Sequence, residues 1–117
     1  MAFNFVQEIS KPIVARSTSA TVKGEPLNIE DLMVIPDATL ASNSSGQEFS
    51  ANIFGVYRVA KEAASSGKGL SFGDKVYWDA TNKRATTTST NNKALGYVVR
   101  NAATTDEEVE IALWQLN

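Results

Sequence analysis

The chain has 117 residues, which is enough for a single domain with a modest hydrophobic core. Its composition, 43% hydrophobic and 21% charged, is that of an ordinary globular protein, and a net charge of −2 provides no basic field to attract nucleic acid. Histidine and cysteine are both absent, which excludes disulfides, zinc sites built from these residues and a nucleophile–histidine relay.

The N-terminal end, residues 1–12, is predicted to form an arm or an edge strand ahead of a single β domain over residues 13–117. Phe3 and Phe5 alternate with a polar residue, as in an extended segment. Pro12 cannot donate a backbone hydrogen bond to a neighbouring strand, so the first full strand is expected to start directly after it. The first ten residues lack the basic and apolar segments of a signal peptide, so we expect the protein to remain in the cytoplasm of the producing cell.

Two further strands are expected in the first half of the chain. Residues 20–23 form a short strand that is closed by the turn Gly24-Glu25-Pro26. Residues 27–35 end in four consecutive apolar side chains, which favours one buried strand over a helix, although the first residues imitate a helix start weakly. The polar loop over residues 37–47 is then expected at the surface.

The strand predicted over residues 49–59 is largely apolar on both faces from Ile53 onward. This pattern is typical of a strand that is covered on both sides at the centre of a sandwich or barrel. Residues 61–69 have room for one short helical turn at most, because Gly67 and Gly69 interrupt a longer helix.

The clearest local prediction is a β-hairpin within residues 70–90. Gly73-Asp74 is a turn signal, and residues 75–79 then alternate with Val76 and Trp78 on one face. A short polar turn and a threonine-rich run of high β propensity follow, as a second strand requires.

Two strands end the chain. The first contains Gly96 at its centre, which predicts a bulge or a close backbone approach. The last covers residues 107–116, and its inward set is apolar: Val109, Ile111 and Leu113. Its outward side begins with two glutamates but continues as Ala112, Trp114 and Leu116. Such a face needs cover, either from the chain's own N-terminal strand or from another subunit.

These patterns together predict an all-β fold, a compact β-sandwich or barrel of about seven or eight short strands with at most one short helical turn. No run approaches the roughly 18 apolar residues that a membrane-spanning helix needs. Phosphate-binding and calcium-binding loop motifs are missing. Glu108 and Glu110 can share a strand face, but solvated surface charge explains them better than catalysis does. We therefore expect no enzyme activity, metal, cofactor, nucleic acid or membrane partner.

Several stretches of the sequence are similar, in order, to one family. They are residues 4–8 (NFVQE), 24–26 (Gly-x-Pro), 46–48 (GQE), 54–61 (FGVYRVAK), 73–88 (GDKVYWDATNKRATTT) and 95–99 (LGYVV). With these segments the chain resembles the DUF2190-type proteins of phages and prophages, which are capsid decoration, or capsid cement, proteins. The resemblance implies a structural protein, usually a homotrimer, that binds the outer surface of the expanded icosahedral head in the virion and clamps neighbouring subunits of the major capsid protein.

Under this interpretation the candidate capsid-binding residues are Phe3, Asn4, Phe5 and Val6, because exposed aromatic side chains near a free end make good anchors. An ordinary edge strand packed on its own domain is the alternative for this segment. The candidate subunit-interface residues are Trp114 and Leu116. A second class of function is an adhesin-like module on the phage surface that binds glycans or the host envelope, and a small enzyme is a distant third.

Overall fold

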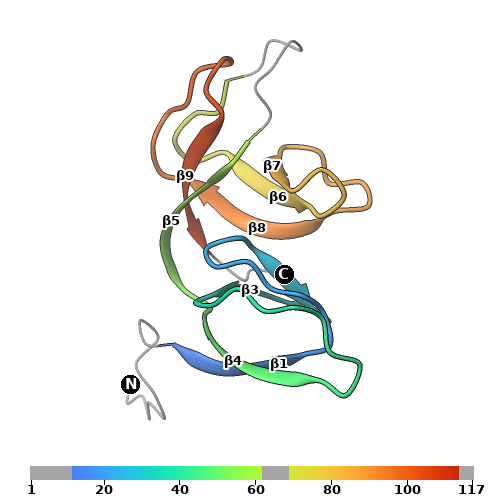
Figure 1. Cartoon of the computed structure of the whole chain (residues 1–117). Helices are drawn as coiled ribbons and strands as arrows, with labels where there is room; N and C mark the ends of the chain where they lie inside the picture. The colour runs from blue at the N-terminus through green and yellow to red at the C-terminus, as the bar shows by residue number, and fades with distance from the viewer. Residues whose placement is uncertain (1–11, 62–68, 114–117) are drawn as a thin grey trace, which may run out of the picture.

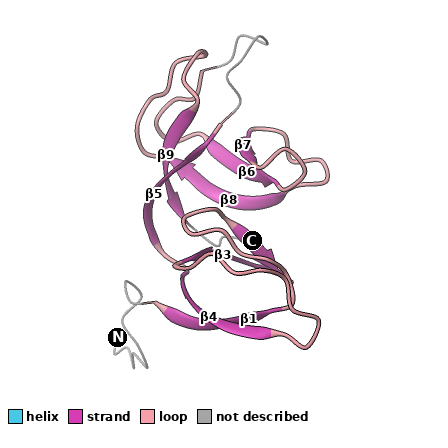
Figure 2. Ribbon diagram, in the orientation of Figure 1, coloured by secondary structure: helices cyan, strands magenta, loops and turns pink. Residues whose placement is uncertain are grey.

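The computed structural model describes residues 12–61 and 69–113, and these residues form nine β-strands and no helix (Figures 1 and 2). The strands make two antiparallel sheets, one of four strands and one of five, so the predicted all-β fold is confirmed. The N-terminal arm and the helical turn expected within residues 61–69 lie outside the described residues, apart from Pro12, Lys61 and Gly69.

The first sheet has the strand order β1-β4-β3-β2. Its strands are β1 (Ile13–Ser17), β2 (Leu27–Ile29), β3 (Leu32–Pro36) and β4 (Gln47–Asn52). β3 pairs with β2 along the whole of β2 but meets β4 only at Ile35 and Pro36. Its side chains alternate between two cores, since Val34 packs with Phe49 in a small core under β1 and β4, whereas Met33 faces the second sheet.

The second sheet has the order β5-β9-β8-β6-β7. Its strands are β5 (Gly55–Ala60), β6 (Lys75–Asp79), β7 (Arg84–Thr86), β8 (Lys93–Val98) and β9 (Glu108–Leu113). Lys61, directly after β5, forms a parallel bridge with Ala85 in β7. Because β5 and β7 are the two ends of the strand order, this bridge curls the sheet into a small, nearly closed barrel (Figure 1).

The main hydrophobic core fills the barrel and extends under β3. Its buried members are Met33, Ile35, Val59, Leu70, Val76, Trp78, Ala85, Leu95, Val98, Ala102, Val109, Ile111 and Leu113. The predicted inward set of the last strand is confirmed, because its three members are at most 3% exposed. The two sheets are also linked at the surface by ion pairs, Lys83 with Glu25 at 3.4 Å and Lys93 with Asp31 at 3.8 Å.

Two local predictions are confirmed in detail. β6 and β7 form the expected hairpin, although β7 has only three residues of the threonine-rich run. In β8 the pairing with β6 shifts register between Val76, which lies opposite Gly96, and Tyr77, which lies opposite Ala94. The expected irregularity at Gly96 is therefore a β-bulge, which bends β8 as closure of a small barrel requires.

The prediction of one strand over residues 27–35 is wrong. The chain reverses in a two-residue turn between Ile29 and Leu32, so β2 and β3 form a hairpin. Glu30 adopts a positive φ of 55°, and the side-chain amide of Asn28 donates to the Glu30 carbonyl oxygen at 2.8 Å. Because a glutamate rarely adopts a positive φ, the sequence does not predict a turn at this position.

The prediction of one central strand over residues 49–59 is also wrong. β4 ends at Asn52 in the first sheet, and β5 starts at Gly55 in the second. β5 lies at the end of its sheet, and Val56 is 61% exposed, so the strand is not covered on both faces. Residues 20–23 contribute only one bridge, between Thr21 and Leu40. Two predicted strands are each divided into two, and the strand predicted over residues 20–23 is absent from the described strands. The structure therefore describes nine strands where seven or eight were expected.

Candidate functional site

The six residues predicted to contact partners all lie outside the described residues. They are Phe3, Asn4, Phe5, Val6, Trp114 and Leu116. The structure does show the surfaces at the points where these segments join the described chain. These are the start of β1 and the end of β9, together with the side chains beside them.

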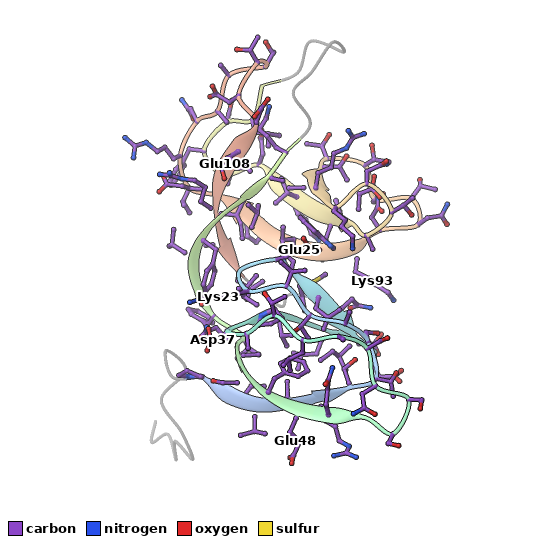
Figure 3. The ribbon with its side chains drawn as sticks, in the orientation of Figure 1. Lys23, Glu25, Asp37, Glu48, Lys93 and Glu108 are labelled. Carbon is purple, nitrogen blue, oxygen red and sulfur yellow. The ribbon has the colours of Figure 1, made fainter. Side chains whose placement is uncertain are left out.

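The first of these surfaces, the β1 edge, consists of Val14 and Arg16 on β1 and their cross-strand neighbours Ser50 and Glu48 on β4. Among the described strands, β1 is the outermost of its sheet and pairs with β4 alone. Val14 is 72% exposed, and Figure 3 shows Glu48 pointing away from the rest of the molecule. An exposed apolar side chain on an outer described strand, among polar neighbours, is a surface on which another chain can dock.

The second surface, the barrel row, runs across the outer face of the barrel. Its members are paired neighbours on four strands: Val56, Ala112, Tyr97 and Lys75. Ala112 and Tyr97 are half-buried, and the Lys75 ammonium group lies 5.5 Å from the centre of the Tyr77 ring. The outward side of the last strand thus becomes apolar at Ala112, as the sequence indicates.

The acidic residues of β9 form an exposed charge cluster. The Glu110 carboxylate lies 3.9 Å from the Arg58 guanidinium and 3.4 Å from that of Arg100. These groups, with Asp106 and Glu108, line an open hollow of about 200 Å³. Both arginine side chains are more than 60% exposed, so each ion pair stabilises the fold by less than about 1 kcal/mol. The cluster is the solvated surface charge expected for Glu108 and Glu110.

The perturbed titrating groups of the described chain have structural causes. Burial raises the pKa of the Tyr57 hydroxyl, and the Asp37 carboxylate adds to this shift. That hydroxyl donates to the Phe54 carbonyl oxygen at 3.0 Å, at the crossing from the first sheet to the second. Hydrogen bonds from the side chain and backbone of Asn82 lower the pKa of the exposed Asp79 carboxyl, at the turn after β6.

Within residues 12–61 and 69–113 no group of three or more acidic residues is placed to hold a metal ion. The same residues contain no helix that is long and apolar enough to cross a membrane.

The exposure of Phe72 was not predicted from the sequence. The turn over residues 71–74 presents Phe72, which is 73% exposed and is the most exposed large apolar side chain among the described residues. The sequence predicts the turn from Gly73-Asp74, but the exposure of Phe72 depends on where the turn lies on the barrel.

Among the described residues, the exposed large apolar side chains lie on strands and turns of a β scaffold. Comparison with known protein families identifies the class of protein. Residues 7–113 match the family of phage cement proteins, so the chain belongs to that family. The match includes every described strand, from β1 to β9, and confirms the resemblance to phage capsid cement proteins. No curated protein and no solved structure matches the chain. Family membership supports a structural, capsid-associated role in the virion.

Proposed function

We propose that this cement protein binds the outer surface of the assembled, expanded icosahedral head as a homotrimer and clamps neighbouring major capsid subunits. The observation that carries the proposal is the family match, which covers all nine described strands. Clamping requires buried contact area and many copies, and it needs neither catalysis nor a cofactor. Three copies in one trimer convert individually weak contacts into tight attachment, and a preference for the expanded shell stabilises that state by mass action.

The N-terminal arm is proposed to make one of the contacts with the shell, through Phe3, Asn4, Phe5 and Val6. The support is its point of attachment, because the arm joins the chain at the β1 edge, where Val14 is already exposed. Deletion of residues 2–8 should abolish shell binding and leave folding intact, because all nine described strands lie within residues 13–113. Full shell binding by the truncated protein would contradict the arm contact.

The contacts between copies are proposed to use Trp114 and Leu116. The segment that contains these residues follows β9 directly, and the barrel row crosses β9 at Ala112, close to the end of that strand. In this arrangement Val56 and Tyr97 would contribute to the same interface.

The direct test is co-sedimentation of the purified protein with expanded, undecorated capsids, with unexpanded procapsids as the control. Saturable binding to expanded shells alone is the expected result. Absence of binding to both shells would contradict the cement role and favour an adhesin-like module. Binding to a glycan panel would then be measured. The protein is proposed to be made in the bacterial host's cytoplasm and to act on the outside of the head.

A further inference from the structure

The Phe72 turn, residues 71–74, is held rigidly on the barrel. Its closing bond runs from the Asp74 amide to the Ser71 carbonyl oxygen at 3.0 Å, and the Ser71 amide donates to the Asp74 carboxylate at 2.8 Å. The Phe72 amide donates to the side-chain oxygen of Asn101 at 2.7 Å. The Gly73 amide donates to the Val98 carbonyl oxygen at 2.8 Å, so each backbone amide of the turn has an acceptor.

The fold does not require a phenylalanine in this turn. Gly73 has a φ of 93°, which suits the third position of a type II turn, and the position before it accepts most residues. The Phe72 side chain is 73% exposed, so it adds little to the core. Because the backbone of the turn is already fixed, binding through Phe72 would have to order only its side-chain rotamers, and such preorganisation favours an interface anchor.

We propose that Phe72 is a second anchor to the capsid shell and inserts into an apolar pocket on a major capsid subunit. This inference rests on the proposed cement function and adds a residue and a contact to it. The turn lies on the barrel beside the loop between β8 and β9, and Figure 1 shows β1 and β4 at the other end of the molecule. Contacts at both ends allow one copy to touch two shell subunits, and a clamp requires two such contacts.

Three described hollows of this chain are unsuited to receive Phe72 from a second copy. Three hollows on the described surface, of about 200, 610 and 220 Å³, are each lined by four or five charged side chains. Insertion of a phenyl ring there would take those charged groups out of water and give them no new polar partner, which costs free energy. The barrel row, which is proposed to join the copies, does not include the turn.

The experiment measures the affinity of variants for expanded, undecorated capsids by co-sedimentation. Phe72→Ser should weaken shell binding about thirty-fold or more, as expected for loss of a central anchor. Phe72→Trp should retain most of the affinity, because tryptophan also serves as an anchor. Asn101→Ala keeps the phenyl ring but removes the acceptor of the Phe72 amide, so it should weaken binding several-fold. Val22→Ser, at another exposed apolar side chain, is the matched control and should bind normally.

Melting temperature and sedimentation velocity are measured on each variant beside the binding assay. Loss of shell binding by Phe72→Ser with unchanged folding and unchanged oligomeric state supports the second anchor. Equal binding by Phe72→Ser and the unsubstituted protein overturns it and leaves the cement role standing. Dissociation of the oligomer by this substitution would place Phe72 between copies and also overturn it. Failure of the unsubstituted protein to bind either shell would overturn the cement role and the anchor together.

Discussion

The ammonium group of Lys61 lies 2.8 Å from the carbonyl oxygen of Asp106, in the loop between β8 and β9. It also donates to the carbonyl oxygens of Ala103 at 3.1 Å and Thr104 at 3.4 Å, and the residue is only 6% exposed. The same residue forms the parallel bridge with Ala85 that brings the two ends of the second sheet together. One lysine therefore fastens this loop and closes the barrel.

Substitution of Lys61 with methionine should lower the free energy of unfolding by about 2 kcal/mol, because charged hydrogen bonds to the loop are lost while the apolar stem is kept. The measurement is urea denaturation of the two proteins. Lys93→Met is the matched control: Lys93 is exposed and its ammonium group forms a surface ion pair with Asp31, so the loss of stability should be below about 1 kcal/mol. Equal losses at the two lysines would mean that Lys61 does not hold the loop.

Gly55 marks the point where the chain passes from the first sheet to the second. Its φ of 128° is strained for any residue with a side chain, and an added Cβ would lie 3.1 Å from the Tyr57 hydroxyl oxygen. Gly55→Ala should therefore destabilise the protein by about 1–3 kcal/mol. Gly24→Ala, at a φ of 81° with nothing within 4 Å of the added Cβ, should cost less. Thermal melts of the two variants test the order, and a smaller loss at Gly55 would contradict it.

The raised pKa of Tyr57 predicts an alkaline loss of stability. The unfolded chain releases this proton near the ordinary pKa of 10.0, whereas burial, aided by Asp37, keeps it bound in the folded state to higher pH. Since the folded state then binds more protons, the free energy of unfolding falls as pH rises above about 10, until the folded-state pKa is passed.

Tyr57→Phe should remove this part of the pH dependence. The variant loses the hydrogen bond to the Phe54 carbonyl oxygen, so it should be about 1 kcal/mol less stable at neutral pH. The difference from the unsubstituted protein should shrink between pH 9 and about pH 11, as Tyr57 ionises preferentially in the unfolded chain. Urea denaturation across this range measures the difference, and a gap that stays constant or widens would contradict the expectation.

The parts of the fold that the sequence predicts are those set by near neighbours in the chain. The alternation of Val109, Ile111 and Leu113 places their side chains on one face whatever lies opposite. The β-bulge at Gly96 and the hairpin of β6 and β7 follow from glycine and turn residues within the strands themselves. Such signals need no knowledge of the partner strand.

The parts that the sequence does not predict depend on distant contacts. The sequence of β4 and β5 has the pattern of one apolar strand. The change of sheet at Gly55 is visible only from the pairing, because β4 pairs with β1 and β5 pairs with β9. The backbone amide of Phe72 is held by the side chain of Asn101, 29 residues away. The capsid-associated role was predicted from the family resemblance and from no site motif. A docking surface of exposed side chains has no sequence motif comparable to a catalytic triad.

The proposed contact between copies makes a last prediction about the barrel row. Val56 is 61% exposed in one copy, so Val56→Asp should leave folding intact but place a charge in an apolar interface, where burying it would be costly. We expect this variant, like Trp114→Ser, to self-associate at least tenfold more weakly than the unsubstituted protein, as measured by sedimentation equilibrium. Val22→Asp, at an exposed position outside the row, is the matched control and should assemble normally. If the free protein is a monomer, cross-linking on expanded shells measures the same contact. Full assembly of Val56→Asp would show that the copies meet at another surface.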